Sequence, residues 1–208
     1  MRPLAKLTVV TLEHTIAAPF ATRQLADLGA RVIKVERPGV GDFARGYDER
    51  VRGLASHFVW TNRSKGSLTL NVKHPEAQMI LNRLIAENAD VVVQNLAPGA
   101  AARLGLSYET LSKVKPDIIV CDISGYGGEP SEGPYSDKKA YDLLIKARRV
   151  FSLSLAHRTI HQGRGFRSQT SQRECTRTAI FWRHYCIARK QAKGSTSICR
   201  YWNRSANG

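Results

Sequence analysis

The 208-residue sequence has no long apolar segment and only 4 cysteines. No run of residues approaches the roughly 18 apolar positions that a membrane-spanning helix needs, so we expect no membrane partner. The first apolar run, residues 7–13, is short and carries a charge, which argues against a signal peptide. The cysteines show neither the CxxC spacing of a metal site nor the density of a disulfide framework. These absences predict a reduced, cytoplasmic protein with no metal site.

Acidic residues are almost missing from one part of the chain. Residues 1–147 hold 19 Lys and Arg against 16 Asp and Glu, whereas residues 148–208 hold 13 against a single Glu. A net charge of +15 would ordinarily suggest a nucleic-acid partner. Because most of this excess lies after residue 147, the charge divides the chain into a balanced part and a basic tail.

The balanced part alternates short β-branched runs with helical patterns. Strands are predicted over residues 7–13, 31–37, 68–72, 90–95 and 117–124. Helices are predicted from near Pro19 to just before Gly29, over residues 74–88 and over residues 107–114. In the second helix Ala77, Ile80, Leu81, Leu84 and Ile85 have the spacing of one apolar face. The pattern predicts an α/β fold, a Rossmann-like open parallel sheet with flanking helices.

Glycines and basic residues follow or precede several of the predicted strands. Arg37 follows the second strand, Asn95 and Arg103 follow the fourth, and Lys65 lies just before the third. Taken singly, such residues are ordinary turn formers or surface charges, and GVGDFARG lacks the GxGxxG spacing of a dinucleotide fingerprint. Gathered at one edge of a parallel sheet, they favour a ligand that carries several phosphates.

Five segments in this order resemble the N-terminal part of the class III coenzyme A transferases. They are AAPFATRQLADLGARVIKVERPGVGD, NRSKGSLTLNVKHPEA, ADVVVQNLAPGAAARLGL, SGYG and AYDLL. The resemblance covers residues 4–147. This family includes formyl-CoA transferase, carnitine CoA-transferase and the bile-acid-inducible enzymes.

The resemblance implies a Rossmann-like large domain, a second smaller domain and an interlocked homodimer. It implies a catalytic aspartate at Asp142, no permanently bound cofactor, and a coenzyme A thioester and a small carboxylic acid as substrates. Its coenzyme A contacts fall on Ile16, Ala17, Arg37, Lys65, Asn95 and Arg103. Family members commonly carry Gln or Arg near Ile16, so this chain departs from the family pattern there.

The chemistry that the resemblance implies needs a carboxylate, because an amide or a hydroxyl cannot form an anhydride. The Asp142 carboxylate would attack the thioester carbonyl to give a mixed anhydride and release the coenzyme A thiolate. The thiolate would return to form an aspartyl-CoA thioester, from which the acceptor acid would collect coenzyme A. Backbone donors of a glycine-rich loop, expected further along the chain, would stabilise the oxyanion.

Two alternatives stay open. Acyl-CoA racemases share the architecture but carry a His directly before the equivalent aspartate, where this chain has Tyr141. A non-catalytic nucleic-acid-binding protein would need the tail's charges on a folded surface.

The tail, residues 148–208, does not continue the family pattern. Back-translated and read in another frame, residues 152–159 can yield LTGTPD, and the residues beyond can yield a helix-like run of the kind that the family carries there. We therefore expect an out-of-frame, irregular or disordered tail that needs no nucleic-acid partner. The chain would then be a truncated, inactive form of the transferase.

Overall fold

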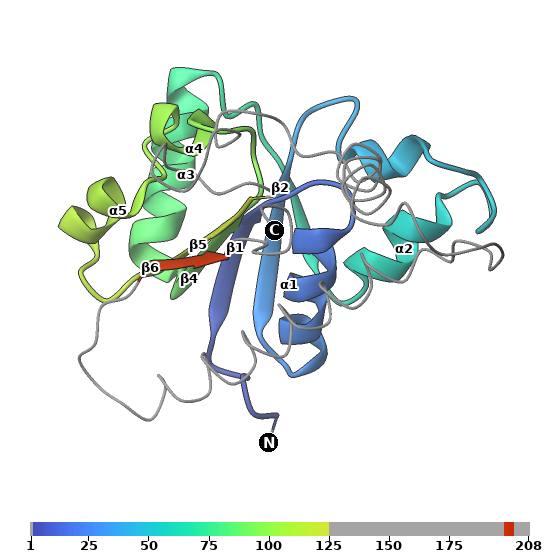
Figure 1. Ribbon diagram of the computed structural model, residues 1–208, viewed down its shortest axis with the longest axis horizontal. Helices are drawn as coiled ribbons and strands as arrows, with labels where there is room; N and C mark the ends of the chain where they lie inside the picture. The colour runs from blue at the N-terminus through green and yellow to red at the C-terminus, as the bar shows by residue number, and fades with distance from the viewer. Residues whose placement is uncertain (1, 125–197, 202–208) are drawn as a thin grey trace, which may run out of the picture.

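The computed structural model describes residues 2–124 and 198–201, and its centre is a six-stranded sheet in which every neighbouring pair is parallel (Figure 1). The strand order is β3-β2-β1-β4-β5-β6, the doubly wound order of Rossmann folds. The strands are β1 (Thr8–Leu12), β2 (Arg31–Glu36), β3 (Gly66–Thr69), β4 (Val91–Gln94), β5 (Ile119–Ile123) and β6 (Ile198–Tyr201). The predicted α/β class and parallel sheet are confirmed.

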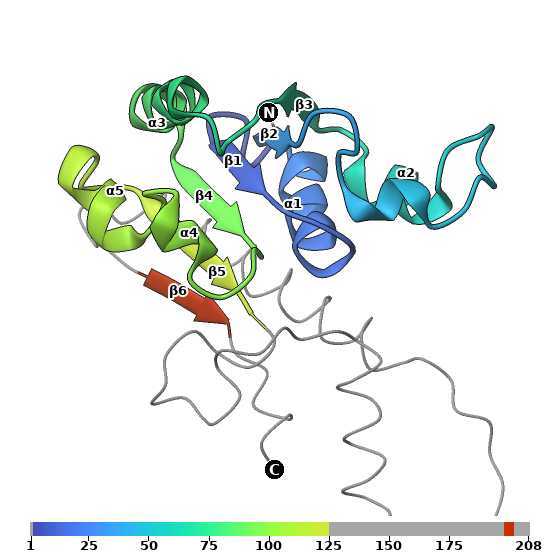
Figure 2. The ribbon, with the colours of Figure 1, turned by 90° about the horizontal axis from the view of Figure 1, so that it is seen from above.

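Helices cover both faces of the sheet, as the view from above shows (Figure 2). Helices α1 (Ala17–Asp27) and α2 (Ser56–Asn62) lie on one side, and α3 (Pro75–Asn88), α4 (Ala100–Arg103) and α5 (Tyr108–Val114) lie on the other. A short 3₁₀ helix, η1 (Phe43–Gly46), follows β2. The result is a three-layer arrangement with a separate apolar core on each face of the sheet.

Side-chain alternation along the strands assigns residues to these two cores. Val9 packs with Leu25 of α1, whereas its neighbour Val10 packs with Leu81 of α3. Strand β4 is buried along its whole length, which explains why its sequence VVVQ shows little alternation. The apolar face predicted for α3 is confirmed at Ala77, Leu81 and Ile85, but Ile80 is 55% exposed because it lies at the margin of that face.

Glycine, proline and serine at the helix ends determine where three of the helices begin or end. Gly29, at φ 100°, terminates α1, where the Gly29 amide donates to the Ala26 carbonyl and the Ala30 amide donates to the Leu25 carbonyl. Pro75 begins α3, and the Ser107 hydroxyl caps α5 by accepting a hydrogen bond from the Thr110 amide.

Some elements differ from the sequence predictions. Strand β3 lies two residues earlier than expected at its start, and helices α2 and α4 were not predicted. Within the tail, Ile198–Tyr201 form the edge strand β6 and pair with β5, so these four residues are regular where we expected irregular chain. The predicted domain boundary at residue 147 lies outside the described residues. None of the helices in the described chain has the length and apolar character needed to cross a membrane.

Candidate functional site

The carboxyl ends of β1, β2 and β4 meet where the direction of strand order reverses. The chain passes from β1 outward to β2 and β3 and then returns to β4 on the other side of β1. Ligands of open parallel sheets bind in the crevice outside such a switch point. Ile16 and Ala17 lie here, at the start of α1, and Asn95 lies here directly after β4.

Asn95 connects the carboxyl end of β4 to the carboxyl end of β1 through two hydrogen bonds. Its carbonyl Oδ1 accepts a hydrogen bond from the His14 amide at 2.8 Å, and its Nδ2 donates to the His14 carbonyl at 2.9 Å. Two bonds from one planar amide fix both the position and the tilt of the backbone they hold. Asn95 therefore fixes the backbone at His14, and it lies at the sheet edge where the sequence predicted it.

The loop after β2 folds back over the same edge. The Arg37 Nη2 group donates to the Gly41 carbonyl at 3.2 Å, and its guanidinium lies 4.6 Å from the centre of the Phe43 ring. The arginine is nevertheless exposed. Gly41 has φ 60°, and a Cβ there would come within 2.7 Å of the Arg45 and Glu36 side chains, so a larger residue would strain the backbone and displace this ion pair.

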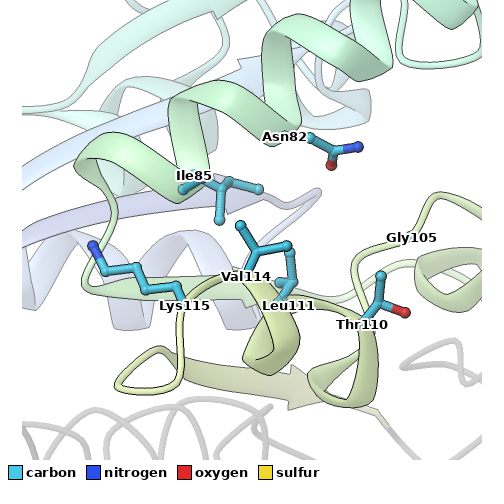
Figure 3. A pocket seen from close by; sticks show the side chains of 8 residues that line it. Asn82, Ile85, Gly105, Thr110, Leu111, Val114 and Lys115 are labelled. Atoms are coloured by element: carbon cyan, nitrogen blue, oxygen red, sulfur yellow. The ribbon is translucent and has the colours of Figure 1, made fainter.

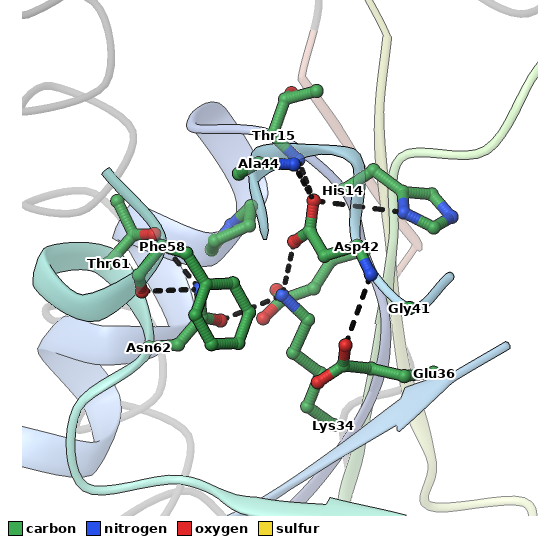
Figure 4. A network of polar contacts seen from close by, with 12 residues as sticks. His14, Thr15, Lys34, Glu36, Gly41, Asp42, Ala44, Phe58, Thr61 and Asn62 are labelled. Carbon is green, nitrogen blue, oxygen red and sulfur yellow. Dashed lines mark hydrogen bonds and ion pairs between the residues drawn. The ribbon is translucent and has the colours of Figure 1, made fainter. Parts of the chain in front are cut away.

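Ionised and polar side chains fill the space between the α1 face of the sheet and helices α1 and α2. We call this set the buried polar cluster; its members are Glu13, Thr22, Lys34, Asp42, Asn62 and Lys65. The Asp42 carboxylate pairs with the Lys34 ammonium, which also donates to Asn62 Oδ1 at 2.7 Å (Figure 4). The cluster joins three loops that are far apart in the sequence.

Lys65 belongs to this cluster rather than to the surface. Its side chain is 2% exposed, and its ammonium donates to Glu13 Oε1 at 2.7 Å, to the Pro19 carbonyl at 2.8 Å and to Asn62 Oδ1 at 3.2 Å. These three acceptors match its three N–H donors. Burial lowers the pKa of Lys65 to about 8, and the Glu13 carboxylate opposes that shift.

His14 lies between the cluster and the Arg37 loop. Burial lowers the pKa of His14, and this outweighs the opposing effect of the Asp42 carboxylate. Its Nδ1 atom lies 3.9 Å from Asp42 Oδ1, too far for a hydrogen bond, and it has no hydrogen-bond partner within the described part of the chain. A neutral imidazole in this position does not form an ion pair with Asp42.

The predicted coenzyme A positions are therefore brought together only in part. Ile16, Ala17, Asn95 and Arg37 lie at the switch point, and Lys65 lies behind them in the buried polar cluster. Arg103 is exposed at the last residue of α4, and no interaction in residues 2–124 joins it to the others. Asp142 lies outside the described residues.

Two hollows in the described chain lie away from this edge. One of about 110 Å³ opens between α3 and α5, with Ile85, Leu111 and Val114 in its wall (Figure 3). The other, of about 420 Å³, lies beside β2 and β3 near Arg31, Gly66 and Leu84. Neither is lined by a predicted ligand residue, so the switch point remains the candidate site. Among residues 2–124 and 198–201, no cluster of three or more metal-binding side chains occurs.

Sequence reasoning missed Glu13, Lys34 and Asp42 as members of the site. A charged residue inside or at the end of an apolar strand, as in LTVVTLE and RVIKVE, could have marked Glu13 and Lys34, but Asp42 lies in the loop after β2 and has no such signal. Such residues are rarely fully buried unless they are paired.

A family model described as CoA-transferase family III matches residues 4–165. Over 148 residues the chain is 42% identical to succinyl-CoA:glutarate CoA-transferase from Mus musculus, an alignment that covers 71% of this chain and 33% of that protein. It is 39% identical over 142 residues to formyl-CoA:oxalate CoA-transferase from Afipia carboxidovorans, covering 68% of this chain and 32% of that protein. The chain thus spans about a third of the length of these curated relatives.

Solved structures show the same likeness. The crystal structure of a CAIB/BAIF family protein from Brucella suis aligns with a TM-score of 0.76 and 31% identity, covering 94% of this chain and 52% of that one. A hypothetical protein (Rv3272) from Mycobacterium tuberculosis aligns with a TM-score of 0.80 and 26% identity, covering 99% and 56%.

Proposed function

The chain belongs to CoA-transferase family III, and from this we propose that its switch-point edge binds the coenzyme A part of an acyl-CoA. The full reaction would move coenzyme A from an acyl-CoA to a free carboxylic acid. The names of two relatives pair a short acyl-CoA with glutarate or oxalate as the acceptor. We infer a small dicarboxylic acid as the acceptor class for this protein.

The observation that carries the proposal is the convergence of Asn95, the start of α1 and the Arg37 loop. Helix α1 is 11 residues long and has no acidic residue in its first turn. Its first amide groups and its dipole favour an anion at that end. With exposed Arg37 on the neighbouring loop, the edge suits the phosphates of coenzyme A.

Each site residue has a separate role in this proposal. Ile16 and Ala17 present backbone amides, Arg37 and Arg103 present positive charge, and Asn95 holds the backbone at His14. Lys65 acts indirectly: its ammonium is fully used by protein acceptors, so it supports the first turn of α1 through the Pro19 carbonyl.

Asp142 is the nucleophile in the proposed reaction. Its carboxylate attacks the thioester carbon, the C–S bond breaks, and the thiolate leaves as the aspartyl anhydride forms. The thiolate then attacks the aspartyl carbonyl of the anhydride and displaces the acyl group as a carboxylate. The acceptor carboxylate reverses these two steps and departs as its coenzyme A thioester.

We further propose that residues 148–208 are not a functional part of the enzyme and that the full-length protein acts as a homodimer. On this view the 208-residue chain binds coenzyme A but does not complete turnover, because an out-of-frame tail would replace the family sequence that follows Asp142.

Calorimetric titration of the purified chain with coenzyme A tests the binding step. Saturable binding that weakens in an Arg37→Ala variant is expected, and the absence of binding would overturn the proposed function. A separate assay with succinyl-CoA and glutarate tests turnover. Product formation that Asp142→Asn abolishes would support the nucleophile and refute the inactivity of this chain.

A further inference from the structure

Thr15, the residue directly before the proposed ligand contacts of α1, has an unusual backbone conformation. Its φ is 68°, in the left-handed region that β-branched residues rarely occupy. Such a conformation persists only where surrounding contacts impose it. The Thr15 amide donates a hydrogen bond to Asp42 Oδ1 at 2.9 Å, across 27 residues of sequence.

The Asp42 carboxylate connects the two loops of the candidate site. Oδ1 also accepts from the Ala44 amide at 2.9 Å, and Oδ2 pairs with the Lys34 ammonium, as Figure 4 shows. The side chain has no exposed surface. Buried hydrogen bonds to a charged acceptor are shorter and stronger than those between neutral groups, so this carboxylate is well suited to hold backbone.

The start of α1 and the Arg37 guanidinium, the two groups proposed to bind the ligand, each adjoin a backbone segment that Asp42 holds in place. Ile16 follows Thr15 directly, and the Arg37 guanidinium donates to the carbonyl of Gly41, the residue before Asp42. The Asp42 amide itself donates to Glu36 Oε2 at 3.1 Å, which ties the loop back to the end of β2. A displacement of Asp42 would therefore shift the start of α1 and the Arg37 loop together.

We propose that Asp42 is a positioning residue that sets the start of α1 and the Arg37 loop as one surface for a phosphate-bearing ligand. It does so by imposing the left-handed conformation on Thr15. The inference rests on the proposed function for the identity of the ligand, but its structural part does not. No contact between Asp42 and the ligand is required.

The test compares Asp42→Ala and Asp42→Asn with a matched control, Asp90→Asn. Asp90 also accepts a backbone hydrogen bond with its carboxylate, from the Thr8 amide at 2.7 Å, but at the opposite end of β1. Two measurements are made on the 208-residue chain well below the unfolding temperature: hydrogen exchange at the Thr15 amide, and coenzyme A affinity by calorimetry.

Asp42→Ala should speed exchange at Thr15 by about tenfold or more and weaken coenzyme A binding about tenfold, because a charged hydrogen-bond acceptor is lost. Asp42→Asn keeps an oxygen acceptor, so smaller changes in the same direction are expected. Asp90→Asn should leave both quantities within about twofold of wild type.

A Thr15→Gly substitution separates positioning from simple stability. Glycine adopts a positive φ without strain, so Thr15→Gly in the Asp42→Ala background should recover about fivefold in affinity. A purely structural role for Asp42 predicts no recovery, and that outcome overturns the proposal. Unchanged Thr15 exchange in Asp42→Ala also overturns it.

The two measurements separate failure of the proposed coenzyme A binding from failure of the proposed structural role of Asp42. If wild type does not bind coenzyme A, the proposed function fails, and the exchange comparison alone then decides whether Asp42 sets the loop. If exchange accelerates while affinity stays unchanged, positioning of the ligand surface is refuted although the loop contact is real.

Discussion

Both faces of the central sheet are buried beneath helices, but they differ in chemistry. On the α3 side, the core consists of apolar residues such as Val10, Leu81 and Val120, and at the carboxyl ends of the strands it holds one buried amide, Gln94, which donates to Asp122 Oδ1 at 2.7 Å. On the α1 side, Val9 and Leu25 form an apolar core, but toward the carboxyl ends the buried polar cluster takes its place. The difference coincides with the edge at which ligands bind in such folds.

This contrast shows what each face contributes. A buried Leu or Ile contributes about 1.5–3 kcal/mol through loss of water contact. A buried ion pair contributes little net stability, because desolvation cancels most of the attraction, yet loss of one partner is costly. The α3 face thus stabilises the domain, while the α1 face fixes the geometry of three loops at a site.

Lys34→Met should have the largest effect, because it leaves the buried Asp42 carboxylate without its cation. We expect a loss of about 4 kcal/mol in the free energy of unfolding. Urea denaturation followed by circular dichroism measures it.

The double variant Lys34→Met/Asp42→Asn provides the control. Removing both charges should cost clearly less than the sum of the two single losses, since no unpaired ion remains. Additive losses would contradict the view that the cluster is held by paired charges.

Leu81→Ala tests the other face. Leu81 is 1% exposed in the α3-side core, and its truncation should cost about 3 kcal/mol through lost burial and a cavity. Below the unfolding temperature, coenzyme A affinity should match wild type. A parallel loss of affinity would mean that the two faces are not functionally distinct.

The pH dependence of stability should report Lys65. Burial lowers the pKa of Lys65 from 10.5 to about 8 in the folded protein, against the pull of Glu13 and Asp42 and with the help of Lys34. Between about pH 8 and pH 10.5 the unfolded chain keeps a proton that the folded chain has released. Stability should therefore rise with pH across this window, by about 1 kcal/mol per pH unit.

Below pH 8 both states hold the proton, so Lys65 gives no slope there. Lys65→Arg is the matched control, because a guanidinium keeps its charge throughout the window. Between pH 8 and pH 10 the denaturation midpoint of wild type should rise relative to that of Lys65→Arg, so that the difference between the two proteins changes steadily in favour of wild type. Parallel curves would show that Lys65 does not titrate in this range.

The sequence predicted the apolar framework but not the buried polar cluster, for physical reasons. Periodicity reports burial of apolar side chains, so β1, β2, β4 and β5 and helices α1, α3 and α5 were found close to their true limits. Helices α2 and α4 are short, with 7 and 4 residues, and too few turns define a periodic face. Strand β3 has little buried surface and no clear alternation.

Pairing across the fold explains why the buried polar cluster was not predicted. Lys34 and Asp42, or Glu13 and Lys65, are 8 and 52 residues apart, and nothing local in the sequence marks them as partners. Lys65 was predicted to contact coenzyme A, and only the structure shows that Glu13, Asn62 and Pro19 occupy its ammonium. Arg37 and Asn95 were located correctly at the sheet edge because strand ends are set by the same apolar pattern.

Arg37→Ala should have the smallest effect on the free energy of unfolding, yet it tests most directly whether the ligand binds at the carboxyl ends of the strands. Arg37 is exposed, so its loss should change the free energy of unfolding by about 0.5 kcal/mol or less. Arg31, also exposed, lies at the opposite end of β2 and carries the same charge, which makes Arg31→Ala a matched control. If the switch-point edge holds the phosphates, Arg37→Ala should weaken coenzyme A binding about tenfold and Arg31→Ala by less than about twofold. Calorimetric titrations at two salt concentrations measure both variants. Equal losses that vanish at high salt would show that general charge attraction, not a site at the carboxyl ends of the strands, draws the ligand to this protein.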